Sequence, residues 1–276
     1  MTLHLEKEIA DAWRGDDPFV HAQQQRGEIF RDKEGRRTLR FALDAAHGDV
    51  NKKHYFLKLH QGIGWGEVWK NLMQFRLPVI GARNEWLAIK KLQQLGVHTM
   101  TAVGYGRRGH NPARQLSFLI TDELAGTISL ATLCERWLRQ PPRFALKRAL
   151  IARVAEIART LHENGVNHRD FYLCHFLIEF SAHETLTAEN LRVYIIDLHR
   201  AQIRAKTPRR WIIKDLAGLY FSALDIGLTA RDVLRFMKIY ARKNTHQLME
   251  DRAFWMKVMR RAQRLARRAK QLDRPK

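Results

Sequence analysis

The chain is organised around residues 168–177, which read His-Arg-Asp-Phe-Tyr-Leu-Cys-His-Phe-Leu. This stretch follows a helical pattern directly and therefore places Asp170 in a loop after a helix. Residues 193–201 read Val-Tyr-Ile-Ile-Asp-Leu-His-Arg-Ala, an apolar, partly β-branched run that ends in an acid. Such a run predicts a strand that carries Asp197 out of its end. We therefore expect two carboxylates on neighbouring loops.

Two acids in this arrangement suit phosphoryl transfer. One carboxylate accepts the proton of the attacking hydroxyl, and the other holds the magnesium ion that bridges the phosphates. The His-Arg-Asp order fits the catalytic loop of protein kinases, and Asp197 stands where the metal-binding Asp of Asp-Phe-Gly would be. Because three-residue matches arise by chance, the interpretation depends on partners elsewhere in the chain.

One such partner is Lys58, the single lysine in the apolar part of a strand predicted over residues 53–60. A lysine in a buried strand is costly unless it is paired. Residues 81–92 form a good helical stretch that Gly96 ends, and Glu85 lies one turn into it. The alternative is an exposed lysine and an ordinary first-turn Glu favoured by the helix dipole. Given the downstream motifs, we prefer a Lys58–Glu85 ion pair that contacts nucleotide phosphates.

Two loops of the N-terminal half offer weaker signals. Residues 28–31 and 38–43 predict a hairpin whose turn holds Gly35, at the place of a glycine-rich phosphate loop. Arg36 and Arg37 in this turn could contact phosphate, although a solvated turn fits equally well. Residues 62–78 match neither the dinucleotide pattern nor the P-loop pattern despite their glycines. We interpret them as an insertion, either a flap, an acceptor-binding loop or a plain linker.

Further elements follow in order. Strands are predicted at residues 97–105 and 115–121, and the second leads into Asp122, Glu123 and Leu124. In a two-lobed kinase these three residues form the hinge whose backbone binds adenine. A long helix is predicted to start at Pro141-Pro142 and to be closed by Asn164-Gly165. A capped helix is predicted from Thr229 through Tyr240, and a last helix from about Asp251.

The last helix separates its side chains by polarity. Its apolar positions are Trp255, Val258, Met259, Ala262, Leu265, Ala266 and Ala269, and its basic positions are Lys257, Arg260, Arg261, Arg264, Arg267, Arg268 and Lys270. An apolar stripe with charges opposite predicts a helix that packs on a core and exposes its arginines.

Length and composition restrict the class of protein and the cellular compartment. The 276 residues suffice for one large domain or two lobes, and 45% hydrophobic residues is ordinary for a globular chain. Cys134 and Cys174 cannot make a disulfide framework, and the charged residues 1–14 lack a signal-peptide core. No apolar run is long enough to span a membrane. We therefore expect a soluble, cytoplasmic protein in a reducing compartment.

The net charge of +21 is unusual. Such a field attracts polyanions, and it leaves nucleic acid, an anionic membrane surface, a phosphorylated substrate and an acidic protein open.

Together, these residues make the chain resemble the lipopolysaccharide core heptose kinases, specifically those that phosphorylate the first heptose. The resemblance rests on residues 55–69, 75–85, 168–177 and 196–201 and extends over nearly the whole chain. It implies an α+β, protein-kinase-like fold with two lobes. Residues 1–124 would form an N-terminal lobe with an antiparallel sheet, one helix and the hinge at its end. Residues 125–276 would form a mainly helical lobe with the catalytic loop and the basic last helix.

The resemblance also implies roles for single residues in a reaction that uses ATP and Mg²⁺. Asp170 matches the catalytic Asp, Lys58 and Glu85 match the ion pair, and Asp197 matches the metal-binding Asp. The family pattern departs at His175, which replaces the Asn expected five residues after Asp170. Magnesium prefers oxygen ligands, so His175 is a poor candidate for a second metal ligand. This leaves either a one-metal site or a His175 that faces the acceptor.

The second departure is the short stretch from Asp197 to Asp215, which has no Ala-Pro-Glu sequence. A protein substrate usually needs a longer activation segment, so a small or glycan acceptor is favoured over a protein (tyrosine) kinase. The alternative from another class is a basic nucleic-acid-binding protein. The chain has no zinc motif, RNA-recognition signature or obvious recognition helix, although its last helix could still lie on a phosphate backbone. A scaffold that has lost catalysis is disfavoured because the four candidate active-site residues are all retained.

The resemblance finally implies partners and a location. The acceptor would be a lipid-linked core oligosaccharide with anionic sugars and phosphates, at the cytoplasmic face of the inner membrane. The exposed arginines of the last helix would then meet either that anionic surface, with the protein attached peripherally, or an acidic protein such as an acyl carrier protein.

Overall fold

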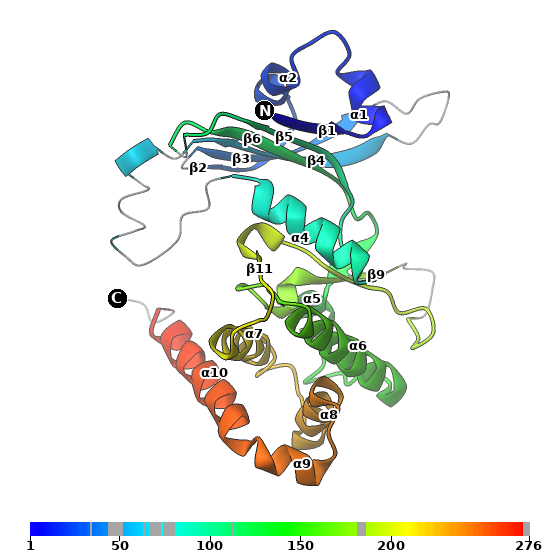
Figure 1. The fold of residues 1–276 in the computed structure, drawn as a ribbon. Helices are drawn as coiled ribbons and strands as arrows, with labels where there is room; N and C mark the ends of the chain where they lie inside the picture. The colour runs from blue at the N-terminus through cyan, green and yellow to red at the C-terminus, as the bar shows by residue number, and fades with distance from the viewer. Residues whose placement is uncertain are drawn as a thin grey trace. The chain divides into compact units, whose positions relative to one another are not determined.

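The structure is a computed structural model that describes residues 1–33, 35–43, 52–62, 64–66, 73, 81–111, 113–180 and 186–272. These residues divide into two compact units. Unit 1 comprises Met1–Lys91 and Met100–Ala125, and unit 2 comprises Leu92–Thr99 and Gly126–Lys276. The helices and strands of both units are labelled in Figure 1.

Unit 1 is built on an antiparallel sheet of six strands in the order β1-β5-β6-β4-β3-β2. Its strands are β1 (Thr2–Leu5), β2 (Glu28–Lys33), β3 (Arg36–Leu43), β4 (Lys53–Gln61), β5 (Ala102–Arg108) and β6 (Leu116–Asp122), and its helices are α1 (Lys7–Ala12), α2 (Pro18–Gln24) and α4 (Arg83–Gln94). Helices α1 and α2 lie on one side of the sheet and α4 on the other (Figure 1). The predicted hairpin is present as β2 and β3, with Gly35 at a φ of 69° in its turn.

The first 25 residues, for which no element was predicted, contribute one strand and two helices to unit 1. Strand β1 pairs with β5 at an edge of the sheet, and α1 and α2 add to the one helix that was expected. Ile9, Trp13 and Phe19 from this segment are buried against Phe118 and the other apolar residues of the sheet. The segment is therefore part of the hydrophobic core.

Unit 2 is mainly helical. Its helices are α5 (Leu130–Cys134), α6 (Phe144–Glu163), α7 (Arg209–Ser222), α8 (Ala230–Ala241), α9 (Thr245–Glu250) and α10 (Arg252–Leu272), with two 3₁₀ turns, η1 (Leu173–His175) and η2 (Leu198–Arg200). Its short strands are β7 (Thr127–Ser129), β8 (Val166–Asn167), β9 (Phe176–Glu179), β10 (Val193–Ile195) and β11 (Gln202–Ile203). Helix α6 packs against α8, and α7 packs against α10.

The predicted helices of unit 2 are confirmed. Helix α6 begins after the two prolines and buries Leu150, Val154 and Leu161 along one face. Helix α8 begins with a full capping box, in which Thr229 and Asp232 each bond the backbone amide of the other. A capping box satisfies two amides that would otherwise lack partners at the start of a helix.

Two strands of two residues tie the catalytic segment to the segment that follows Asp197. Strand β8 pairs with β11 through Gln202 opposite Asn167 and Ile203 opposite Val166. Gly165, just before β8, has a φ of 76°, and a Cβ atom there would overlap the carbonyl oxygen of Arg204. Only glycine allows this close backbone approach.

Helices α5, α6, α7, α8 and α10 line an apolar cavity of about 110 Å³. Trp137, Leu150, Leu219, Phe236 and Val258 are among the mostly apolar side chains that line it.

In the part of the chain that the structure describes, no helix has both the length and the apolar character needed to cross a bilayer.

Candidate active site

The backbone of the catalytic loop is held by Asp215 of α7. Its carboxylate accepts hydrogen bonds from the amides of His168, at 2.6 Å, and Arg169, at 2.8 Å. Arg169 has a φ of 76°, which is unfavourable for a side-chain-bearing residue. Asp215 is 1% exposed, so two charge-assisted bonds in a buried setting stabilise this conformation.

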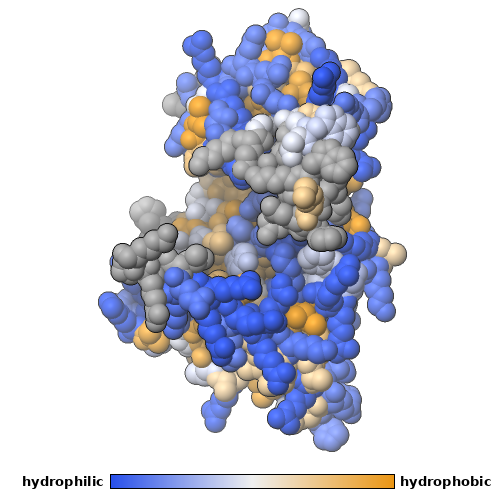
Figure 2. Space-filling view, turned by 90° about the vertical axis from the view of Figure 1, so that its left-hand side faces the viewer, coloured by the Kyte–Doolittle hydropathy of each residue, from blue (hydrophilic) through white to orange (hydrophobic). Residues whose placement is uncertain are grey.

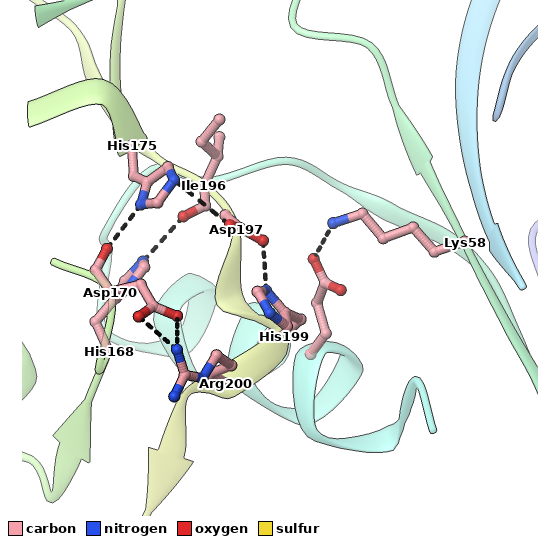
Figure 3. Close-up of polar contacts among 9 residues, drawn as sticks. Lys58, His168, Asp170, His175, Ile196, Asp197, His199 and Arg200 are labelled. Atoms are coloured by element: carbon pink, nitrogen blue, oxygen red, sulfur yellow. Dashed lines mark hydrogen bonds and ion pairs between the residues drawn. The ribbon is translucent and has the colours of Figure 1, made fainter. Parts of the chain in front are cut away.

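The carboxylate of Asp170 is bound by Arg200. The Nη1 atom of Arg200 lies 2.8 Å from Oδ1 and 3.1 Å from Oδ2 of Asp170 (Figure 3). Arg200 belongs to η2, three residues beyond Asp197, and no sequence motif predicts its role. This ion pair fixes the orientation of Asp170.

Asp197 also stands in a left-handed conformation, with a φ of 62°, where β10 leads into η2. Its Oδ1 lies 2.6 Å from Nδ1 of His199, and its Oδ2 lies 3.4 Å from Nε2 of His175 (Figure 3). The carboxylate side chain is 34% exposed and offers the hard oxygen atoms that magnesium prefers.

His175 bridges the two acid-bearing loops. Its Nδ1 lies 2.7 Å from the carbonyl oxygen of Asp170, so Nδ1 carries the proton of this bond. Hydrogen bonding to Cys174 raises the pKa of His175 to about 9 against the effect of burial, with further support from the Asp170 carbonyl and the Asp197 charge. A protonated imidazole has no lone pair for a metal ion. His175 is thus a donor in this arrangement, and its metal-binding role stays a prediction.

His168 makes the second link between the loops. Its ring is fully buried, and its Nε2 lies 2.9 Å from the carbonyl oxygen of Ile196 (Figure 3). Burial lowers the pKa of His168, which favours the neutral ring that donates through Nε2.

In unit 1, Lys58 and Glu85 form the expected ion pair. Nζ of Lys58 on β4 lies 2.5 Å from Oε1 of Glu85 on α4 (Figure 3). The Glu85 side chain is 1% exposed and that of Lys58 is 23% exposed, which excludes the alternative of a solvated strand lysine. Contact between Lys58 and a nucleotide stays a prediction.

The three hinge candidates lie at the end of β6. The amide of Asp122 donates to the carbonyl of Thr101, and the amide of Glu123 donates to the carbonyl of His54. The carboxylate of Glu123 accepts a bond from Arg40 at 2.8 Å. An adenine contact by Asp122, Glu123 or Leu124 stays a prediction and would use other backbone groups.

Among the described residues, no three or more His, Cys, Asp or Glu side chains form a metal-binding group. Magnesium in phosphoryl-transfer sites needs only one or two carboxylates, because substrate phosphates complete its coordination. Asp197 fits that limited role. Most of the insertion predicted at residues 62–78 lies outside the described residues.

Comparison with known proteins gives consistent matches. The sequence profile of the lipopolysaccharide kinase (Kdo/WaaP) family matches residues 20–240. The chain is 49% identical over 271 residues to the lipopolysaccharide core heptose(I) kinase WaaP of Pseudomonas aeruginosa, covering 97% of each chain. It is 50% identical over 240 residues to the enzyme of that name from Escherichia coli K12, covering 86% of each. A solved structure, WaaP in complex with acyl carrier protein, superimposes with a TM-score of 0.81 at 44% identity, over 96% of this chain and 99% of that one.

Proposed function

This chain belongs to the lipopolysaccharide kinase (Kdo/WaaP) family, and we propose that it phosphorylates a hydroxyl of the first heptose of the lipopolysaccharide inner core with ATP. The observation that carries the proposal is the identity of about half with heptose(I) kinases, over 271 residues for one relative and 240 for the other.

In this reaction Asp170 accepts the proton of the attacking heptose hydroxyl. A carboxylate base must be held in hydrogen-bonding reach of that hydroxyl. Arg200 fixes the carboxylate, while Asp215 fixes the backbone beneath it through the amides of His168 and Arg169. Catalysis of phosphoryl transfer depends mostly on such positioning and on electrostatic stabilisation.

Asp197 would hold a magnesium ion, with His199 orienting its carboxylate. When bound, magnesium neutralises charge on the phosphate oxygens of ATP. In unit 1, Lys58 would contact the nucleotide phosphates, and Glu85 would keep the ammonium group in place. Replacing either of these two residues should therefore weaken nucleotide binding.

The function is tested by incubating the purified protein with labelled ATP and a panel of truncated core acceptors. We expect transfer only to acceptors that contain the first heptose, and mass spectrometry of the product should place one phosphate on that sugar. Transfer to a different sugar, or to protein tyrosine alone, would contradict the assignment.

We further propose that the basic face of α10 binds an acidic carrier protein. Lys257, Arg260, Arg261, Arg264 and Arg267 of α10 line a groove with Arg210 and Ile213 of α7. Figure 2 looks at the side of the molecule on which α10 lies, and this part of unit 2 is mainly hydrophilic. The solved relative in complex with acyl carrier protein supports this partner.

The opposite face of α10 lines the apolar cavity through Trp255, Val258 and Met259. An acyl chain delivered by the carrier protein would find there a lining of matching polarity. Carrier protein with and without an acyl chain should bind with different affinities, and equal affinities would exclude a role of the cavity.

The location that we propose is the cytoplasmic side of the inner membrane, with peripheral attachment through the same basic face. Fractionation of cells should find the protein in the membrane pellet at low salt and released from it at high salt.

A further inference from the structure

Four cationic side chains surround Trp211 at the start of α7. The Trp211 ring centroid lies 5.1 Å from the Arg169 guanidinium carbon, 5.4 Å from Lys214 Nζ, 5.8 Å from the Arg210 guanidinium carbon and 5.9 Å from that of Arg204. We call these five residues the Trp211 cluster. Cation–π contacts of this kind supply part of the stabilisation that a carboxylate would otherwise give.

In the part of the chain that the structure describes, none of the four cations forms a salt bridge with a carboxylate. The Arg204 side chain donates hydrogen bonds to the neutral side chains of Asn167 and Gln202. The nearby acid Asp215 is buried and bonds the backbone amides of the catalytic loop. Asp170 and Asp215 attract Arg169 and Lys214 without forming a salt bridge with them, so the cluster keeps an excess of positive charge.

Burial and the neighbouring cations both disfavour the charged forms of two cluster residues. Burial lowers the pKa of Lys214, and repulsion from Arg169 and Arg200 lowers it further. The pKa of Arg169 is lowered by burial and by repulsion from Arg200. Like charges kept together in a partly buried place are typical of binding sites for ligands of the opposite charge.

The end of α7 adds to the same field. Its N-cap is Pro208, which supplies no side-chain cap, and its first turn contains no acid. Arg209 and Arg210 stand there instead, although the positive end of a helix dipole favours anions. Helix N-termini with exposed amides bind phosphate and carboxylate groups readily. Helix and side chains thus point to the same kind of ligand.

The cluster adjoins the proposed catalytic base. Arg169 immediately precedes Asp170 in the chain, and Arg200, which repels both Arg169 and Lys214, bonds the Asp170 carboxylate. A ligand group at the cluster would therefore lie beside the hydroxyl that Asp170 activates.

From this arrangement we infer that the Trp211 cluster binds an anionic group of the acceptor, a carboxylate or a phosphate, and so holds the acceptor hydroxyl at Asp170. The inference rests on the proposed function and adds the site that selects acidic core oligosaccharides over neutral sugars. The nucleotide is a less suitable occupant, because the proposed magnesium site at Asp197 already serves its phosphates.

The experiment removes positive charge from the Trp211 cluster and, separately, negative charge from the acceptor. Arg210 and Lys214 are the cluster residues to change, because no hydrogen bond of their side chains is seen within the described residues, whereas Arg204 bonds two neighbours. The double variant Arg210→Gln/Lys214→Gln is compared with wild type on three acceptors. These are a truncated core acceptor, the same acceptor with its carboxylates reduced to alcohols, and the same acceptor with its phosphates removed enzymatically.

We expect wild type to prefer the intact acceptor over one stripped form by about tenfold or more in kcat/KM, as for hydrogen bonds to charged groups. The stripped acceptor whose kcat/KM falls below that of the intact acceptor identifies the group, carboxylate or phosphate, that the cluster binds. In the double variant the preference should fall to near one, with the KM for ATP unchanged. Lys214→Arg, which keeps the charge, should retain the preference.

The matched control is Arg231→Gln/Lys238→Gln, which removes two exposed cations from α8. It should keep the wild-type preference. An undiminished preference in the cluster variant would overturn the inference, and so would a higher KM for ATP with the preference intact. Calorimetric binding of the acceptors without ATP gives the same ratio independently of turnover, so a failure of the proposed kinase reaction is distinguished from a failure of the cluster.

Discussion

At the scale of single residues, Asp170 is the group on which turnover should depend most. Asp170→Asn keeps the shape of the side chain but cannot accept the hydroxyl proton. General-base catalysis contributes roughly 10²- to 10⁴-fold, so turnover should fall by about that factor while ATP binding stays near normal. Steady-state kinetics at saturating substrates measures this, with Asp225→Asn, an exposed acid of unit 2, as control. Retention of more than about a tenth of wild-type turnover would rule out the role.

A second residue-scale prediction distinguishes metal binding by Asp197 from direct nucleotide binding by Lys58. Asp197→Ala should weaken ATP binding only when magnesium is present, because its carboxylate acts through the ion. Lys58→Ala should weaken ATP binding with and without magnesium, because its ammonium group contacts phosphate directly. Calorimetric titrations with and without a chelator measure both effects. If Asp197→Ala bound magnesium-ATP as tightly as wild type does, the metal assignment would have to be given up.

The candidate acids Asp170 and Asp197 and the Lys58–Glu85 pair could be identified from the sequence, because motifs and strand patterns are local signals. Arg200 and Asp215 could not be assigned in this way. Arg200 meets Asp170 across 30 positions of sequence, and Asp215 meets the amide of Arg169 across 46. Their roles arise from tertiary contacts, which periodicity does not encode. Even so, an Asp in the buried stripe of a helix is a signal worth examining, since buried acids need partners.

At the scale of elements, the start of α8 depends on the charge of Asp232. Its carboxylate bonds Thr229 in the capping box and pairs with Lys147 at 2.8 Å. Burial opposes ionisation, but the bonds to Lys147 and Thr229 prevail and lower the pKa of Asp232 from 3.8 to about 2. A shift of this size corresponds to about 2 kcal/mol.

Asp232→Asn should therefore lower the free energy of unfolding by about 2 kcal/mol near neutral pH. Because the folded-state pKa is depressed, this contribution is fully present above pH 3.8 and is lost as the pH falls towards about 2. Urea denaturation of variant and wild type at several pH values measures the difference. A difference that stayed constant down to the lowest pH would show that shape, and not charge, carries the effect.

Elements with long periodic patterns were predicted with little error, as α6, α8 and α10 show. The elements of the first 25 residues were not predicted, because β1, α1 and α2 have only four to seven residues each. A pattern needs a longer window before its period can be recognised. Their stability comes from packing against the sheet, and the sequence of the segment alone does not reveal that packing.

At the scale of the whole molecule, whose net charge is +21, the basic face of α10 should control attachment to anionic surfaces. Each Lys or Arg near such a membrane contributes about 1 kcal/mol, screened over about 10 Å at 0.1 M salt. Changing Arg260, Arg264, Arg267 and Arg268 together to Gln should lower binding to anionic vesicles and raise the KM for a lipid-linked acceptor. Turnover on a soluble, delipidated acceptor should barely change.

The control for this experiment removes four exposed cations elsewhere in unit 2, Arg136, Arg139, Arg231 and Lys238. It should bind vesicles nearly as wild type does, since the effect depends on the α10 face and not on total charge. Equal vesicle binding by both variants and wild type at low salt would leave α10 with a structural role. Loss of carrier-protein binding alone would assign the face to that partner.

The family and the protein-kinase-like fold predicted from the sequence are confirmed by the profile match and the superimposed structure. Whole-chain resemblance was informative here because several long segments agreed at once. The binding partners could be predicted less specifically than the fold, because a basic helix face attracts a membrane and an acidic protein alike.

Gly165 has a consequence for how mutational scans of this enzyme should be interpreted. Any side chain there would push the Arg204 carbonyl away and break the two-residue ladder between β8 and β11. A growth-based scan should thus show Gly165 to be as intolerant of substitution as Asp170, although its role is structural. A parallel scan of cellular abundance should separate the two positions. Variants of Gly165 should disappear from the cell, whereas Asp170→Asn should accumulate as an intact, inactive protein.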